Sequence, residues 1–296
     1  MVHVSLKDLY RREYAVIWAL LSFKAGLMNA AGFFFAGSYV SHVTGFGTQI
    51  GIALGHQQID LGIELLVIPI AFIGGGVLTS LLLDRGYSVD RIPNYPLVQF
   101  LITALLGLIA LLCSWGVFER NPEFPNGEKS VVLIGLLCLV CGLKNSLTTW
   151  ATHGKIRTTH LTGLSTDIGL HLPKLFQSEG ANSRYREPKK VNYVRILTFF
   201  SFSGGSCVAA MLLSIIGYKI FYFTFGLSLF LLTISIVHRQ RLLESVTLQV
   251  RSGGESDWQF LEVQGVNPSL EMDRLSADGL NAHEDKNNNK NNGFYV

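Results

Sequence analysis

The sequence predicts an all-α integral membrane protein with about six transmembrane helices, arranged as two inverted repeats of three spans each. The chain has 296 residues, of which 49% are hydrophobic and only 15% are charged, whereas soluble domains are usually about 25% charged. Its apolar residues gather in runs of about 20, the length of helix that crosses a bilayer. A ten-residue motif occurs twice, which indicates an internal duplication.

The predicted spans follow from the long apolar runs. They lie at about 14–36, 61–83, 97–118, 131–152, 194–217 and 219–238. Basic residues precede the first run, as in a signal peptide, but this run is longer than the apolar core of a signal, so we expect a retained span. Backbone groups find no partner in lipid, and the runs lack the two-residue alternation of a barrel strand, so the spans must be helices.

The duplicated motif reads H-x-T-G-x-x-T-x-I-G and begins at His42 and again at His160. Two flanking blocks repeat in the same order, Gly26-Leu27-Met28-Asn29 with Gly142-Leu143-Lys144-Asn145 before the motif, and Phe72-Ile73-Gly74-Gly75-Gly76 with Phe202-Ser203-Gly204-Gly205-Ser206 after it. Because each copy holds three spans, the second must enter the membrane from the opposite face, so the repeat is inverted. We assign the glycines of the last block to close helix packing.

The two motif segments, at about 38–56 and 155–176, are too short and too polar to be confident spans. We therefore expect re-entrant or broken half-helices, one from each face. The alternative is that both segments cross fully, which gives eight spans and parallel repeats. That alternative would place Lys155 and Arg157 in the membrane, at about 2.5–3.5 kcal/mol each near its centre.

The distribution of Lys and Arg predicts that both termini are cytoplasmic, and we expect a multi-pass protein of the cell inner (cytoplasmic) membrane. The predicted outer segments hold only Arg120, Lys129 and Lys219, whereas basic residues gather in the inner segments. The expected organisation is a cytoplasmic segment at 1–13, membrane repeats at 14–118 and 131–238, and a cytoplasmic tail at 239–296. The tail is polar and Asn-rich, so we expect it to be mostly disordered, with a short helix around 238–250.

The candidate solute-binding residues are the polar groups of the two copies inside the membrane. They are Asn29, His42, Thr44, Thr48, Lys144, Asn145, His160, Thr162, Thr166 and Asp167. Freed amides at a half-helix end attract anions and freed carbonyls coordinate cations, and inverted-repeat transporters place such ends near the midplane. The alternative is that Gly allows close packing and each Thr bonds to its own helix.

The ionisable residues Lys144 and Asp167 distinguish the second copy, because the first has Met28 and Gln49 at these places. Charges inside a membrane are costly without a role. We expect a Lys144–Asp167 pair that binds an anion or relays a proton, and the alternative is a structural ion pair. Lys24 lies toward the end of its predicted span, where a solvated position is the default.

The paired histidines and asparagines each allow two interpretations. His42 and His160 titrate near neutral pH, which suits proton coupling, or they bond a neighbouring carbonyl and do nothing more. Asn29 and Asn145 each lie well inside a span, where an amide either joins two helices or contacts a ligand.

Metal and cofactor sites are not expected. Cys138 and Cys141 have C-x-x-C spacing, but they lack the second Cys or His pair that a zinc site requires. The four cysteines lie in apolar runs, so no disulfide framework is expected. The formal charge of +3 is too small to indicate nucleic acid. The expected partners are membrane lipid and a small-molecule solute, and a homo-oligomer stays open.

We predict a small secondary transporter or permease for a small polar or anionic solute, bound between the two motif segments. One alternative is a non-transporting scaffold or sensor that recruits a cytoplasmic partner through its tail. The other is a membrane enzyme acting on a lipid-soluble substrate, which the absence of nucleophile, zinc and paired-carboxylate motifs disfavours.

Gly26-x-x-Asn29 with Thr44-Gly45, and Gly142-x-x-Asn145 with Thr158-Thr159-x-x-Thr162-Gly163, resemble the YoaK-like family of multi-pass bacterial membrane proteins, the domain of unknown function numbered 1275. The resemblance covers about residues 12–240. That family often has Asp where Asn29 stands and Asn where Phe46 follows Thr44-Gly45. The first difference removes an obvious proton carrier from the first half. The resemblance implies an integral membrane protein and supplies no substrate.

Overall fold

The computed structural model describes residues 12–84, 93–118, 128–152, 154, 158–175 and 186–252, and every regular element within them is helical. The long helices are α1 (Arg12–Ala36), α3 (Ile59–Asp84), α4 (Tyr95–Ser114), α5 (Glu128–Thr152), α7 (Arg186–Ile216) and α8 (Ile220–Ser252). The short helices are α2 (Val43–Gly55) and α6 (Leu161–Leu175), and the 3₁₀ turn η2 (Gly217–Lys219) joins α7 to α8.

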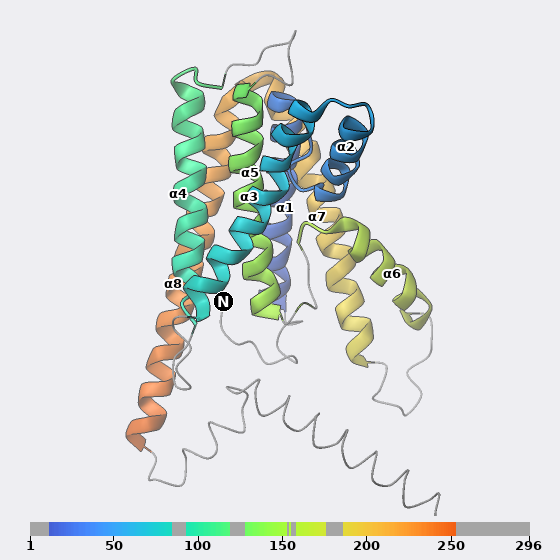
Figure 1. Cartoon of the computed structure of the whole chain (residues 1–296). Helices are drawn as coiled ribbons and strands as arrows, with labels where there is room; N and C mark the ends of the chain where they lie inside the picture. Colours follow the sequence, from blue (N-terminus) through green and yellow to red (C-terminus); the bar gives the residue numbers. More distant parts are fainter. Residues whose placement is uncertain are drawn as a thin grey trace, which may run out of the picture.

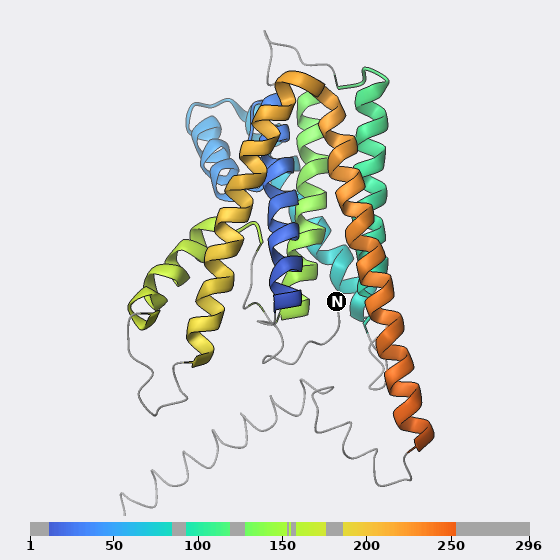
Figure 2. The ribbon, with the colours of Figure 1, turned by 180° about the vertical axis from the view of Figure 1, so that it is seen from behind.

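Five stretches of the described residues are long and apolar enough to cross a membrane. They are Tyr14–Ala36, Ile59–Leu83, Tyr95–Ser114, Val131–Thr152 and Lys189–Gln240. The last has 52 residues and takes in most of α7 and of α8, which run in opposite directions (Figures 1 and 2). The chain is therefore a multi-pass helical membrane protein, as its sequence predicts.

The long helices form a bundle with α1 and α5 near its centre (Figures 1 and 2). Helices α4 and α8 pack together at one edge, whereas the short helices lie at the opposite edge, α2 beside the upper part and α6 beside the lower part in Figure 1. Helix α1 begins and α8 ends at the same, lower end of the bundle. The most extensive contacts join α1 to α7 and α3 to α5.

Two glycines in the first of the matched blocks set these closest approaches. A Cβ atom on Gly26 in α1 would overlap the carbonyl of Phe202 in α7. A Cβ atom on Gly142 in α5 would overlap the carbonyl of Phe72 in α3 in the same way. Matched residues therefore make matched contacts, and each joins the first long helix of one copy to the second long helix of the other.

The glycines of the last matched block make the reciprocal contacts, from α7 to α1 and from α3 to α5. A Cβ atom on Gly205 would overlap the carbonyl of Phe23, and one on Gly75 would overlap that of Leu139. The predicted packing role is confirmed at Gly75 and Gly205. Their neighbour Gly204 faces open space.

Helix α8 continues to Ser252, beyond the predicted end of the last span at 238. Its lower end lies below the other helices in Figure 1. The short helix predicted around 238–250 is therefore part of α8. The rest of the predicted tail, from 253, lies outside the described residues, as do residues 1–11 of the predicted N-terminal segment.

We predict that Gly205→Ala destabilises the protein by about 1–3 kcal/mol, because a buried methyl group forced against a backbone carbonyl displaces the helix. The matched control is Gly204→Ala on the next residue of α7, where the methyl meets nothing within 4 Å. Thermal unfolding of both purified variants checks this. Equal melting temperatures would contradict the close α1–α7 contact.

Candidate functional site

Two matched asparagines hold the chain where it turns back after each central helix. The Asn29 side-chain oxygen accepts hydrogen bonds from the Ser41 backbone N–H at 3.1 Å and from the Ser41 hydroxyl at 3.0 Å. The Asn145 side-chain oxygen accepts one from the Thr159 hydroxyl. Each asparagine lies about two helical turns before the end of its helix, so the following segment has returned toward the middle of the bundle.

The short helices start from these tied positions and run away from each other. Helix α2 leads from the middle back to the upper end, where Leu54 packs near Gly62 of α3. Helix α6 leads from the middle to the lower end (Figure 1). The N-terminal ends of α2 and α6 therefore both lie at the middle level of the bundle.

The stretches of chain between α1 and α2 and between α5 and α6 are the two return segments. Each return segment is also bonded to the central helix of the other half. The Ser22 hydroxyl of α1 donates to the Thr158 carbonyl at 3.0 Å, and the Cys138 thiol of α5 donates to the Val40 carbonyl at 3.1 Å. Counting along the matched blocks pairs Ser22 with Cys138 and Val40 with Thr158. The two bonds therefore join matched positions, one from α1 to the second return segment and the other from α5 to the first.

The four predicted threonines lie on exposed faces of the short helices and bond within them. Thr48 donates to the Thr44 carbonyl and Thr166 to the Thr162 carbonyl, both at 3.2 Å. The alternative prediction, that threonine bonds to its own helix, is confirmed for Thr48 and Thr166. The structure does not bring these side chains together with Lys144.

The predicted histidines lie at the starts of the short helices, and both are exposed. His42 precedes α2 without a side-chain capping hydrogen bond. The His160 ring packs edge-on against Phe72, with ring centroids 6.3 Å apart. The structure therefore places this pair at matched positions, at the starts of the two short helices.

The predicted Lys144–Asp167 pair is wrong. A carboxylate oxygen of Asp167 lies 3.0 Å from a guanidinium nitrogen of Arg195 on α7. The Lys144 ammonium instead donates to the Leu21 carbonyl of α1. Asp167 faces the neighbouring helix α7, whereas Lys144 points toward α1 in the centre of the bundle, so the two side chains have different partners.

The structure reveals a second buried lysine that sequence reasoning placed in solvent. Lys24 is 0% exposed, and its ammonium donates to the Ser228 hydroxyl at 3.1 Å. The Gln99 amide donates to the same hydroxyl at 3.1 Å, and the Thr103 hydroxyl lies 2.9 Å from it. The available signal was Gln99 and Thr103 one helical turn apart in an apolar run, which places two polar groups on one face of α4.

The two buried ammonium groups have no carboxylate beside them among the described residues. Lys24 and Lys144 are close enough for their charges to interact, and both lie near Cys141. The buried polar residues include no Asp or Glu in the described part of the chain. An ammonium has three N–H donors, and each lysine uses one in the bonds described above, so the centre has an excess of hydrogen-bond donors.

Unpaired polar atoms also occur among the buried side chains of α5, of α7 and of the segment before α6. The Asn145 side-chain nitrogen and the Thr158 hydroxyl are buried without a hydrogen-bond partner. Asn192 of α7 is 0% exposed, and neither its oxygen nor its nitrogen is bonded. Buried polar groups are ordinarily paired, so these atoms are suited to binding water or a polar ligand.

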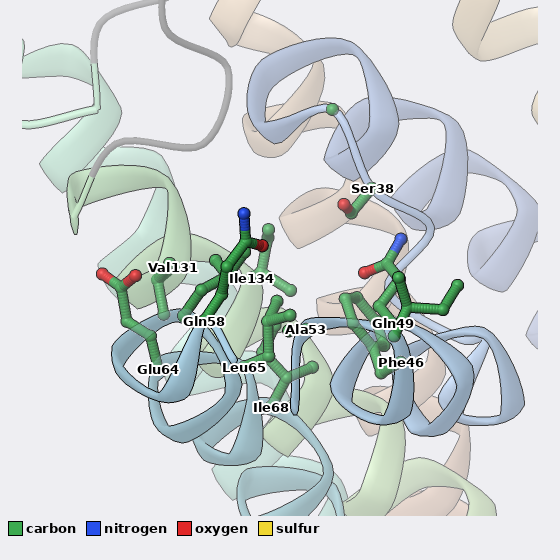
Figure 3. Close-up of a pocket in the computed structure, with 13 residues that line it drawn as sticks. Ser38, Phe46, Gln49, Ala53, Gln58, Glu64, Leu65, Ile68, Val131 and Ile134 are labelled. Atoms are coloured by element: carbon green, nitrogen blue, oxygen red, sulfur yellow. The ribbon is translucent and has the colours of Figure 1, made fainter. Parts of the chain in front are cut away.

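A cavity of about 340 Å³ lies between α2, α3 and α5 (Figure 3). Its polar lining groups are Ser38, Gln49, Gln58 and Glu64. Its apolar lining residues are Phe46, Ile52, Ala53, Leu61, Leu65, Ile68, Val131 and Ile134, with Gly37 beside them. Sequence reasoning missed this site, because only folding brings the two glutamines and the carboxylate to one space.

Comparison with known families identifies the family of the chain. A family model described as "Protein of unknown function (DUF1275)" matches residues 17–234. The chain belongs to this family. The resemblance to the domain of unknown function numbered 1275 is thereby confirmed. Neither the curated proteins nor the solved structures gave a match.

The DUF1275 match begins inside α1 and ends inside α8, so it takes in both copies of the motif, the buried lysines and the cavity. Residues 253–296 lie beyond it. Among the residues of this DUF1275 chain that the structure describes, no three His, Cys, Asp or Glu side chains are grouped to hold a metal ion.

We predict that Lys144→Met stabilises the protein by about 1–4 kcal/mol, because it replaces a buried charge that lacks a counter-charge by an apolar side chain. Methionine already occupies the matched position 28 of the first copy. The control is Lys219→Met at the exposed turn η2, which should leave the melting temperature unchanged. A lower melting temperature for Lys144→Met would identify the lysine as a structural support.

Proposed function

We propose that this DUF1275 protein is a small secondary transporter for a small polar or anionic solute. The observation that supports it best is the pair of return segments, which approach the middle of the bundle from opposite ends and are tied there by Asn29 and Asn145. Interrupted helices that meet near the midplane are the usual construction of a transporter site.

The matched contacts support an inverted duplication of two three-span units. Gly26 and Gly142 meet matched carbonyls, and the Ser22 and Cys138 bonds are reciprocal. In this arrangement the halves meet across a pseudo-two-fold axis in the membrane plane, and they rock against each other to expose the centre alternately to either side.

The lengths of α2 and α6 support half-helices over full spans. With 13 and 15 residues, they extend about 20 Å and 22 Å at 1.5 Å per residue, whereas the hydrocarbon core is about 30 Å thick. Neither short helix is among the candidate spans of the described residues. The six long helices then cross the membrane and the two short ones re-enter it.

The polar centre supports a solute that offers hydrogen-bond acceptors. Lys24 and Lys144 hold unused donors in a region without buried carboxylates, as described above. The space beside it is closed in this conformation, because the nearby cavity lined by Leu21 and Gln99 measures only about 20 Å³. A solute would reach the lysines only after the helices move apart.

The first and last helices support the predicted orientation. Helix α1 begins and α8 ends at the same end of the bundle, and the positive-inside rule assigns that end to the cytoplasmic side of the inner membrane. The exposed apolar face of α3, which includes Ile63, Ile70 and Ile73, faces lipid in this orientation.

Solute-dependent stabilisation and flux test the proposal. We expect one or more small polar or anionic metabolites to raise the melting temperature of the purified chain, since a ligand present at 100 times its Kd stabilises by about 2.7 kcal/mol. The same solute should be taken up by proteoliposomes, and Asn145→Ala should reduce uptake at least tenfold by releasing the second return segment. A broad metabolite panel without stabilisation or uptake rejects the transporter.

The control for Asn145→Ala is Thr233→Ala on α8. Thr233 is exposed, and its hydroxyl bonds only to the carbonyl of Leu229 in the same helix. Its replacement should leave uptake unchanged. Equal losses in both variants would mean that the Asn145 effect is not specific to the return segment.

The extension of α8 favours a second function, in which the chain is a membrane scaffold or sensor. This helix continues to Ser252, past the end of its candidate span at Gln240. We expect deletion of residues 253–296 to leave solute uptake unchanged in a transporter and to abolish recruitment of a cytoplasmic protein in a scaffold. Uptake into proteoliposomes and co-purification from membranes separate the two outcomes.

A further inference from the structure

We propose that the cavity between α2 and α3 admits the transported solute, that it takes a small uncharged polar molecule, and that Asp167 and Arg195 close the matched space between α6 and α7. The inference rests on the proposed transport function and narrows it. It assigns an open end and a closed end to this conformation.

The matched blocks relate the cavity to a charged cluster in the second half. Counting along them pairs Gln49 with Asp167, Ala53 with His171 and Leu65 with Arg195. The first member of each pair lines the cavity of about 340 Å³, and the second belongs to a group that bonds α6 to α7. Matched positions of the two halves therefore border a cavity in the first half and form a charged cluster in the second.

The charged cluster joins α6 to α7 by two contacts and has a third contact within α6. Besides the 3.0 Å ion pair with Asp167, Arg195 has a guanidinium nitrogen 3.4 Å from the His171 ring nitrogen Nδ1. That nitrogen lies 2.8 Å from the Asp167 carbonyl. The Arg195 side chain is 11% exposed, so it fills the space where its counterpart Leu65 borders a cavity.

The lining of the cavity selects the class of solute. Ser38, Gln49 and Gln58 supply neutral hydrogen-bond donors and acceptors, and Figure 3 shows Gln58 extending into the space from the α3 side. Among the described residues of the lining, Glu64 is the only ionisable side chain, and its carboxylate repels anions. The volume lies within the roughly 300–1,000 Å³ usual for small-molecule sites.

Alternating access requires this kind of asymmetry, since a carrier open at both ends at once would leak. Because an ion pair joins α6 to α7 and a cavity lies between α2 and α3, the conformation is open toward α2. Breaking the ion pair removes contacts that only this state makes, so the population shifts toward the state open toward α6.

Cysteine labelling of the purified chain in nanodiscs, where both ends are accessible, tests the assignment. Ile68 and its matched residue Thr198 are both 0% exposed, but Ile68 borders the cavity, so the smaller side chain of a cysteine at this position leaves its thiol next to that space. In a Cys207→Ser background, which removes the one exposed native thiol, we expect a small methanethiosulfonate reagent to modify Ile68→Cys at least tenfold faster than Thr198→Cys.

Asp167→Asn should raise the labelling rate at Thr198→Cys and lower it at Ile68→Cys, each by about tenfold. Arg195→Gln should act in the same way, and Asp167→Glu, which keeps the charge, should leave both rates near those of the parent. A local ion pair without a gating role would change the rate at Thr198→Cys alone. An unchanged rate at Ile68→Cys therefore overturns the assignment.

Protection from labelling tests the solute class. We expect urea, acetamide or erythritol to slow modification of Ile68→Cys, and we expect acetate and ethylammonium to have no effect. Protection by acetate alone overturns the uncharged-solute assignment. Reciprocal labelling in a chain that moves no solute in proteoliposomes supports the two-ended gate and overturns transport, whereas uptake without reciprocal labelling overturns the gate and leaves transport standing.

Discussion

The close approach of glycine backbones to carbonyls, between α1 and α7 and between α3 and α5, is the constraint on which the rest of the molecule depends. Lipid gives helices little hydrophobic reason to associate, so contact has to come from packing and hydrogen bonds. Where Gly26 meets Phe202, α1 comes close enough for Ser22 to reach the carbonyls of Thr158 and Thr198. The position of the second return segment follows from that contact.

The two halves share a scaffold and differ in their charges. Matched glycines and asparagines make matched contacts. In contrast, Lys144 has Met28 at its matched position in the first copy, and Arg195 has Leu65. A symmetric scaffold would offer two equivalent conformations of equal energy. Charges in one half remove that equivalence, because burying an ammonium or forming an ion pair changes the energy of one of the two conformations and not of the other.

The sequence predicted the helices, the duplicated blocks and the packing glycines, because each leaves a local or periodic signal. It failed at side-chain partners. Lys144 and Asp167 were paired because both are ionisable and near the motif, but the direction of each side chain depends on the helix rotation that packing sets. The burial of Lys24 was not predicted for the same reason, since its hydrogen-bond partner Ser228 belongs to α8, 204 residues further along the chain.

The exchange of partners between halves has a consequence for biogenesis. Ser206 of α7 donates to the Gly26 carbonyl of α1 across 180 residues of chain, so α1 leaves the ribosome long before its partner exists. At synthesis rates of about 5–20 residues per second, the wait is roughly 10–35 s. During that time the first half has Lys24 in the bilayer without its Ser228 acceptor, and it therefore depends on the insertion machinery or on other polar neighbours until translation ends.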